Sequence, residues 1–495
     1  MKTKSLLFVL ALAMSFTLSA ATITVTNGNA SGEGSFAQAY TDAVAGDVIN
    51  FNFDGTEISL AGAVVMKSIT INGLNAFNGQ KMILKQTTAS QAFFTLASGI
   101  TGTFQNLVFD GTGILGNTAI TAANGSTLNI ENCVFKNINA QANNGGAARI
   151  QGVANISGSL FENNTASGGY GGGALCIYNA ASVTIDKCSF TGNTVNINGT
   201  NKNGGGAIVA RATVATACNV TITNSTFANN FSGKTGGAIL SSVQSSTAYT
   251  ANVKAINCTF TGNQGDGAIS ALTTSNGFAN VYLVNSIVVN NVSAAADAYS
   301  DLLETKGSNE ASVVTIEPHN VIYSVASGTV VTTDRNCIQV ADPATANIFK
   351  TLETFATDKK RPVLTETSGH KVAEISATSI ALNAGVATLT GYTIPTVDQL
   401  GATRPATPAI GAVEYDFTNN IIPNQDNQSV KIKMENRTVS FSGLSGEQQI
   451  KVYGLAGNLL HKSLINNNEN LSLGHLNANL VVVRVQDKSF KVLLK

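Results

Sequence analysis

A phenylalanine recurs along the middle of the chain, and the apolar and polar positions around it repeat with it. In most copies apolar residues stand five and seven positions before the phenylalanine, with Asn, Thr or Lys between them. This alternation predicts a short β-strand with one buried face in each copy. The recurring position is occupied by Phe109, Phe135, Phe161, Phe190, Phe227, Phe260 and Val288.

The copies are spaced like the turns of a solenoid. The spacing is 26 residues from Phe109 to Phe135 and 37 residues from Phe190 to Phe227. A period of this length, with insertions of variable size, predicts stacked turns that share one continuous core. We therefore expect an all-β chain.

Asparagine dominates the position three before the phenylalanine. Asn tolerates the left-handed backbone that a sharp turn requires, and stacked amides can hydrogen-bond at the ~4.8 Å spacing of strands. The sequence therefore predicts an asparagine ladder at this turn. The column reads Asn106, Asn132, Gly158, Lys187, Asn224, Asn257 and Asn285.

Cysteine alternates with serine two positions before the phenylalanine. Any two of these cysteines are at least two turns apart, about 10 Å at ~4.8 Å per turn, which exceeds the ~7 Å limit for a disulfide. We interpret them as small buried side chains; a metal site is the alternative, disfavoured because no histidine accompanies them. The column reads Leu107, Cys133, Ser159, Cys188, Ser225, Cys258 and Ser286, and the other cysteines are Cys176, Cys218 and Cys337.

A Gly-Gly-Ala motif follows most of the phenylalanines, beginning at Gly145, Gly172, Gly205 and Gly236. One such loop could suggest a phosphate site, but its repetition once per turn predicts a turn in which no Cβ fits. Together with the F-x-x-N pairs, such as Phe161 with Asn164, the motif resembles the polymorphic outer membrane protein repeat. The resemblance implies a right-handed parallel β-helix.

The sequence predicts a structure at each end of this solenoid. Apolar residues at helical spacing predict a short helix over residues 35–45 that covers the first turn. Residues 22–63 would form this cap and the first turns, and residues 64–417 the β-helix with a closing segment. That segment, from Ser379, resembles the choice-of-anchor domains at Asn383, Gly385, Asp398, Gly401, Arg404, Gly411 and Glu414.

Three charged residues of the closing segment, Asp398, Arg404 and Glu414, form a candidate catalytic group. No histidine or second arginine stands near them in the sequence. We therefore prefer the interpretation that a partly buried ion pair pins the last turn.

The two termini predict export. Lys2 and Lys4 precede an apolar run over residues 6–18, so residues 1–21 read as a signal peptide, and the run is too short to span a membrane. We expect no transmembrane segment in the mature chain. Residues 418–430 read as a linker before residues 431–495.

Residues 431–495 resemble the C-terminal sorting domain of the type IX secretion pathway, a small β-sandwich. The matching residues are Tyr453, Gly457, Lys491 and Lys495, with Leu476 to Asn479 at the family's Leu-x-x-Gly turn. The resemblance implies that outer-membrane secretion machinery recognises this tail and delivers the protein to the cell surface. An ordinary immunoglobulin-like binding module is the alternative.

Composition and charge agree with this organisation. Charged residues make up 12% of the chain, and the net charge is zero. Residues 22–430 hold 18 basic and 25 acidic groups, a net charge of −7, which disfavours a nucleic-acid partner. Stacked identical charges repel, which explains why a solenoid carries few of them.

The sequence assigns no catalytic, metal-binding or cofactor-binding residue. Parallel β-helices often cleave acidic polysaccharides, but Glu131 and Asp186 share a column with Ser157 between them, about 10 Å apart and too far for one Ca²⁺. Arg149 and Arg211 are isolated in the sequence.

We therefore predict a surface protein with an adhesive role or a role in binding carbohydrate or a host ligand. Candidate sugar-stacking rings are Tyr170, Tyr178, Tyr249 and Tyr282, although each alone is more often a packing residue. The alternative is a polysaccharide lyase or glycoside hydrolase with a site around Glu317 and His319 or Asp334 and Arg335.

Overall fold

The computed structural model divides into two compact units, residues 1–415 and 416–495. It describes residues 20–415 and 431–493, apart from 114–115, 142, 196–203, 246, 274–275, 306–311, 324–336, 344, 357, 436, 443, 445, 455–456, 467–468, 477, 479 and 486–487. Most of the predicted signal peptide and the whole linker therefore lie outside the described residues.

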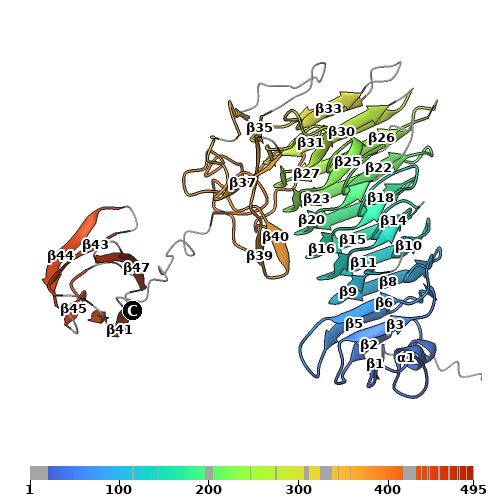
Figure 1. Cartoon of the computed structure of the whole chain (residues 1–495), viewed down its shortest axis with the longest axis horizontal. Helices are drawn as coiled ribbons and strands as arrows, with labels where there is room; N and C mark the ends of the chain where they lie inside the picture. Colours follow the sequence, from blue (N-terminus) through green and yellow to red (C-terminus); the bar gives the residue numbers. More distant parts are fainter. Residues whose placement is uncertain are drawn as a thin grey trace, which may run out of the picture. The chain divides into compact units, whose positions relative to one another are not determined.

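The first unit is a parallel β-solenoid whose turns contribute strands to three long sheets (Figure 1). Sheet A contains, in order, β1 (Thr22–Val25), β2 (Val48–Phe51), β5 (Thr70–Asn75), β8 (Thr101–Gln105), β11 (Thr127–Glu131), β15 (Val153–Ser157), β19 (Ser182–Asp186), β23 (Cys218–Thr223), β27 (Thr250–Ile256), β31 (Phe278–Val284) and β34 (Ser312–Ile316).

Sheet B contains β3 (Glu57–Leu60), β6 (Met82–Gln86), β9 (Leu107–Asp110), β12 (Val134–Lys136), β16 (Leu160–Glu162), β20 (Ser189–Thr191), β24 (Thr226–Ala228), β28 (Thr259–Thr261), β32 (Ile287–Val288), β35 (Val321–Ile322) and β36 (Ile338–Gln339). Sheet C contains β4 (Val64–Val65), β7 (Phe94–Leu96), β10 (Ile120–Ala122), β14 (Ala148–Ile150), β18 (Leu175–Tyr178), β22 (Ile208–Ala212), β26 (Ile239–Val243), β30 (Ile269–Thr273) and β33 (Leu302–Thr305).

A shorter parallel sheet lies between sheets B and C in the order of the chain. It contains β13 (Asn139–Ala140), β17 (Thr165–Ala166), β21 (Thr194–Val195), β25 (Phe231–Thr235) and β29 (Gln264–Asp266). The predicted all-β fold is confirmed.

The recurring phenylalanines stack on one another inside the solenoid. Phe109 and Phe135 have ring centroids 4.4 Å apart and rings inclined by 3°, and the stack continues through Phe161, Phe190, Phe227 and Phe260. All these rings are fully buried. The strand register pairs each of them with the next, which confirms the alignment of the repeats.

The column three before each phenylalanine is the predicted left-handed turn, with φ between +46° and +56° at all seven positions. Its amide ladder is only partly present. Asn132 donates to Asn106 at 2.6 Å, but Gly158 and Lys187 interrupt the column, and Lys81 donates to the Asn132 oxygen at 2.7 Å instead.

A continuous asparagine ladder lies three residues after Phe161, Phe190, Phe227, Phe260 and Val288, at the asparagine of the F-x-x-N motif. Asn164, Asn193, Asn230, Asn263 and Asn291 are fully buried, and each amide nitrogen donates to the next amide oxygen along the first four steps at 2.9 Å. The predicted column therefore carries part of a ladder, and the continuous ladder stands in a second column that is also rich in asparagine.

Helix α1 (Phe36–Asp42) packs at the first turn, as predicted, but ends earlier than residue 45. Ser35 Oγ caps it by accepting from the Gln38 N–H at 3.2 Å, and Phe36, Ala39 and Ala43 are buried. Asp47 accepts from the Val44 N–H at 2.9 Å and from the Ala21 N–H at 2.8 Å. The aspartate thereby ties the end of the helix to the first strand.

Replacing Asp47 by asparagine should lower the thermal unfolding midpoint at neutral pH, because an amide has one acceptor oxygen for two N–H groups. The Val44 N–H holds the pKa of Asp47 below its usual value. The carboxylate therefore stabilises the fold above the usual aspartate pKa, and this contribution is lost as the pH falls through the lowered pKa. Thermal unfolding against pH checks this: the two proteins should converge in acid, and a constant difference would contradict it.

Residues 342–415 fold back along the outer face of sheet B, and they also pack against the last turns through Val321 and Val340. Gln399 Nε2 donates to the Cys188 carbonyl at 2.9 Å, Ala412 N to Thr259 Oγ1 at 3.0 Å and Gly411 N to the Asn285 carbonyl at 2.8 Å. We call this segment the arm. Its hairpins are β37 (Leu352–Ala356) with β38 (Lys359–Pro362) and β39 (Thr365–Thr367) with β40 (His370–Val372), drawn in orange in Figure 1.

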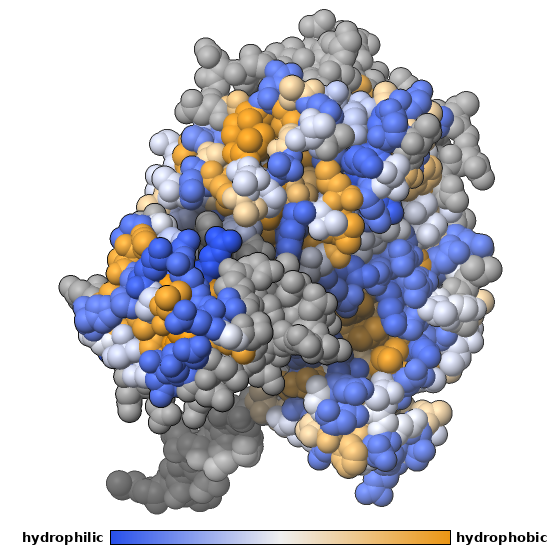
Figure 2. Space-filling view, turned by 60° about the vertical axis from the view of Figure 1, so that its left-hand side comes forward, coloured by the Kyte–Doolittle hydropathy of each residue, from blue (hydrophilic) through white to orange (hydrophobic). Residues whose placement is uncertain are grey.

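Hydrophilic residues cover much of the surface seen in Figure 2, with hydrophobic residues in separate patches. Among the described residues, no helix is long and apolar enough to cross a membrane.

The second unit has two antiparallel sheets around their own apolar core, which includes Phe441, Ile450 and Val483. The small C-terminal sheet region agrees with the predicted fold class. One sheet contains β41 (Lys431–Glu435), β42 (Thr438–Ser442) and β45 (Asn470–Ser472); the other contains β44 (Leu459–Ile465), β43 (Gln448–Tyr453), β46 (Leu480–Val485) and β47 (Lys488–Leu493).

Candidate functional site

The outer face of sheet A carries columns of hydrogen-bonded amides and hydroxyls. Alternation along each strand turns the apolar residues inward and leaves the polar ones outside. In one column Asn155 Nδ2 donates to Asn129 Oδ1 at 3.0 Å, and Thr184 Oγ1 donates to Asn155 Oδ1 at 2.9 Å. Asn155 and Thr184 are exposed and Asn129 is half-exposed.

A second column continues this face on the later turns. Asn252 donates to Asn219, and Asn280 donates to Asn252, both at 2.9 Å. These bonds fix the orientation of side chains that solvent reaches. The face is therefore an ordered array of donors and acceptors that repeats at the strand spacing of ~4.8 Å.

The carboxylates of Glu131 and Asp186 on sheet A bind different neighbours and do not bind each other. Strand register aligns Glu131, Ser157 and Asp186, as predicted. Glu131 accepts from Gln105 Nε2 at 2.8 Å, and Asp186 accepts from Thr223 Oγ1 at 2.6 Å. Each carboxylate thus accepts a hydrogen bond from the neighbouring turn on the side away from Ser157.

Arg149 and Arg211, isolated in the sequence, each pack on a tyrosine of one cluster on the outer face of sheet C. The Arg149 guanidinium donates to the Tyr178 hydroxyl and lies 4.9 Å from the centre of that ring, while Arg211 lies 4.4 Å from the centre of the Tyr170 ring. The two tyrosine rings are 5.9 Å apart.

This cluster corrects two sequence expectations. The arginines are not isolated, and Tyr178 is not a solvent-facing ring, because its neighbours leave it only 5% exposed. Tyr249 and Tyr282 are half-buried, and Tyr249 packs against the core. Counting from the Gly-Gly-Ala alanines would have placed Tyr178 beside Arg211, since both stand four residues after that alanine, and the strands pair them.

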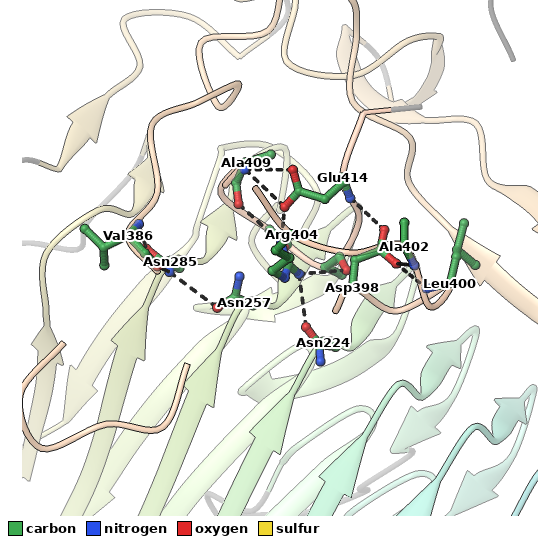
Figure 3. A network of polar contacts seen from close by, with 12 residues as sticks. Asn224, Asn257, Asn285, Val386, Asp398, Leu400, Ala402, Arg404, Ala409 and Glu414 are labelled. Carbon is green, nitrogen blue, oxygen red and sulfur yellow. Dashed lines mark hydrogen bonds and ion pairs between the residues drawn. The ribbon is translucent and has the colours of Figure 1, made fainter. Parts of the chain in front are cut away.

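Arg404 is the centre of a buried polar network between the arm and the solenoid (Figure 3). Nη1 donates to Glu414 Oε1 at 2.5 Å, and Nη2 donates to Asn224 Oδ1 at 3.0 Å and to the Gly411 carbonyl at 3.0 Å. The Arg404 and Glu414 side chains are 2% and 12% exposed. Asp398 accepts from the Glu414 N–H at 2.8 Å.

The predicted ion pair is confirmed, but it pins the arm to the side of the solenoid. Burial lowers the pKa of Arg404 and raises the pKa of Glu414, and their contact offsets part of both shifts. The Arg404 guanidinium thus binds both the arm, at Glu414 and Gly411, and the solenoid, at Asn224. The geometry of this network therefore indicates that it attaches the arm to the solenoid.

The structure gives little support to the alternative enzymatic site around Glu317 and His319. His319 Nδ1 lies 2.7 Å from the Ala384 carbonyl, and Glu317 accepts from the Tyr392 hydroxyl at 3.0 Å, so both bind the arm. Asp334 and Arg335 lie outside the described residues.

The cysteines that alternate with serine, Cys133, Cys188 and Cys258, occupy the small buried positions expected of them. The N–H groups of Cys133, Cys188 and Cys258 donate to the serine hydroxyls of the next turn at 3.0–3.1 Å. Burial raises the pKa of the Cys133 and Cys258 thiols to about 12, so these thiols stay protonated at neutral pH. The six cysteines, all within the described residues, are free thiols.

Within the part of the chain that the structure describes, no group of three His, Cys, Asp or Glu side chains is placed to hold a metal ion.

The fold defines the class of this protein as a right-handed parallel β-helix. Residues 91–292 match the family described as "Right handed beta helix region". No curated protein matches the chain. Among solved structures, it is similar to the crystal structure of pectate lyase Pel9A, with 15% identity, a TM-score of 0.35 and coverage of 81% of this chain and 98% of that chain. A likeness of this degree carries no argument about activity.

Proposed function

We propose that the protein binds an extended polysaccharide along the outer face of sheet A. The observation that supports this proposal is the pair of ordered columns at Asn129, Asn155 and Thr184 and at Asn219, Asn252 and Asn280. An amide has two N–H donors and two acceptor lone pairs. Each column bond uses one of them and leaves others for the hydroxyls of a sugar chain.

The column bonds also reduce the cost of binding. Side chains that are already oriented lose little further conformational entropy when a ligand arrives. A solenoid repeats the same small contact at every turn, so many weak hydrogen bonds add along one chain of the ligand.

We further propose that the protein acts at the cell surface. The basic and apolar pattern of residues 1–21 supports export, and the resemblance of residues 431–495 to a sorting domain supports recognition by outer-membrane secretion machinery. The adhesive role follows from a binding face on a surface-exposed solenoid.

The double variant Asn129→Ala with Asn155→Ala should bind its polysaccharide roughly tenfold or more weakly, because two consecutive turns lose their donors and acceptors. Affinity electrophoresis of the mature chain in gels containing neutral or uronate polysaccharides measures this. Asn124→Ala, an exposed asparagine in a turn, is the matched control and should bind like the wild type.

Equal binding by the double variant and the wild type would contradict this proposal. So would the release of reducing ends or unsaturated products from the same polysaccharides, which would favour a lyase or hydrolase.

A further inference from the structure

A cavity of about 810 Å³ opens where the last strands of sheet B meet the arm. Val340 follows β36, Tyr323 follows β35, and Lys359 begins β38. The described residues that line the cavity are Ala298, Tyr299, Tyr323, Gln339, Val340, Ala341 and Lys359.

Two tyrosines form an aromatic corner in this cavity. The Tyr299 and Tyr323 rings are inclined by 85°, with centroids 5.3 Å apart, and both side chains are half-buried. The Lys360 N–H donates to the Tyr299 hydroxyl at 3.4 Å, and Lys359 Nζ lies 5.4 Å from the centre of the Tyr299 ring. The corner therefore offers apolar ring surface and polar groups side by side.

The Lys359 ammonium group of the cavity is paired with a carboxylate before any ligand binds. Lys359 Nζ pairs with Asp358 at 2.5 Å, and the Lys359 side chain is 13% exposed, against 73% for Asp358. Asp358 raises the pKa of Lys359, and Asp297 adds to this effect. An anionic ligand would gain little from this ammonium group, because the carboxylates of Asp358 and Asp297 already act on it.

We propose that this cavity binds one neutral pyranose unit of a glycan. The apolar C–H face of the sugar would lie against the tyrosine corner, and its hydroxyls would reach the Lys359 ammonium and the exposed Gln339 amide. Pockets of this kind, with aromatic walls and a few polar groups, suit small ligands that carry both surfaces. The site is separate from the columns of sheet A and deepens the proposed glycan binding by naming a neutral sugar.

The test uses the full mature chain and defined oligosaccharides: cellohexaose, maltohexaose and laminarihexaose, with hexagalacturonate as the anionic comparison. The chain contains no tryptophan and 10 tyrosines, so its intrinsic fluorescence comes from tyrosine, and the part contributed by this corner is the part that changes in Tyr323→Ala. We expect at least one neutral probe to bind with a millimolar or tighter Kd. Tyr323→Ala should weaken that binding by roughly tenfold, and Tyr323→Phe should retain most of it because the ring remains.

The controls separate this site from sheet A and from folding. The Asn129→Ala with Asn155→Ala variant should bind the short neutral probe like the wild type, even if it loses the polymer, and Tyr323→Ala should unfold at the wild-type temperature within a few degrees. The proposal fails if no neutral probe binds at millimolar concentration, if Tyr323→Ala binds as well as Tyr323→Phe, or if hexagalacturonate binds more tightly than every neutral probe.

Discussion

Replacing Asn230 by alanine should lower the free energy of unfolding of the solenoid by about 3 kcal/mol. Asn230 Oδ1 accepts from the N–H and the amide of Asn193, and its Nδ2 donates to the Phe190 carbonyl and to Asn263 Oδ1. The substitution leaves the Asn193 N–H and the Phe190 carbonyl buried without this partner, at about 1–3 kcal/mol for each group. The Asn193 amide keeps the Phe161 carbonyl, and Asn263 Oδ1 keeps the Asn230 N–H.

Asn155→Ala is the matched control for this prediction. Asn155 also stands in an amide column, with similar bond lengths, but solvent can replace its partners, so its loss should cost less than about 1 kcal/mol. Urea unfolding followed by circular dichroism compares the two variants. Similar urea midpoints for both variants would contradict the prediction, because the buried ladder would then stabilise the fold no more than the exposed column.

Replacing Arg404 by methionine should release the arm from the solenoid. The change leaves Glu414 as a largely buried carboxylate without its guanidinium and removes the bonds to Asn224 and Gly411. Breaking one side of a buried ion pair costs about 3–5 kcal/mol. We expect faster hydrogen exchange at the N–H groups of Gly411 and Ala412, which bond to Asn285 and Thr259, and unchanged exchange in sheet A.

Lys350→Met provides the control, because Lys350 pairs with Glu374 within the same arm but with side chains 46% and 30% exposed. An exposed pair contributes about 0–1 kcal/mol. Exchange at Gly411 and Ala412 should stay at the wild-type rate in this variant. If Arg404→Met also leaves those rates unchanged, the network does not hold the arm.

The local pattern of the sequence was sufficient to predict the solenoid, because each turn repeats the same apolar columns. Phe190 and Phe227 align by inspection, and the structure stacks them. The position of the asparagine ladder was harder to predict, since Asn224 and Asn230 both belong to asparagine-rich columns. Only the packing of the turns decides that Asn230 bonds within its column while Asn224 binds Arg404.

Contacts between distant parts of the chain could not be predicted in this way. The Arg404 and Glu414 pair is local and was expected, but its attachment to Asn224 joins residues 180 positions apart. The aromatic corner likewise joins Tyr299 and Tyr323 from different loops with Lys359 of the arm. No periodic signal marks such meetings, because each occurs once.

The arm limits how the number of turns can change during evolution. It contacts the turns of Glu162, Cys188, Thr226, Thr259 and Asn285 at fixed points along its own length. Duplication of a turn inside this span would shift every later contact by ~4.8 Å and break the match. Duplication before Phe135 would leave the match intact, so repeat number in related chains should vary on the N-terminal side.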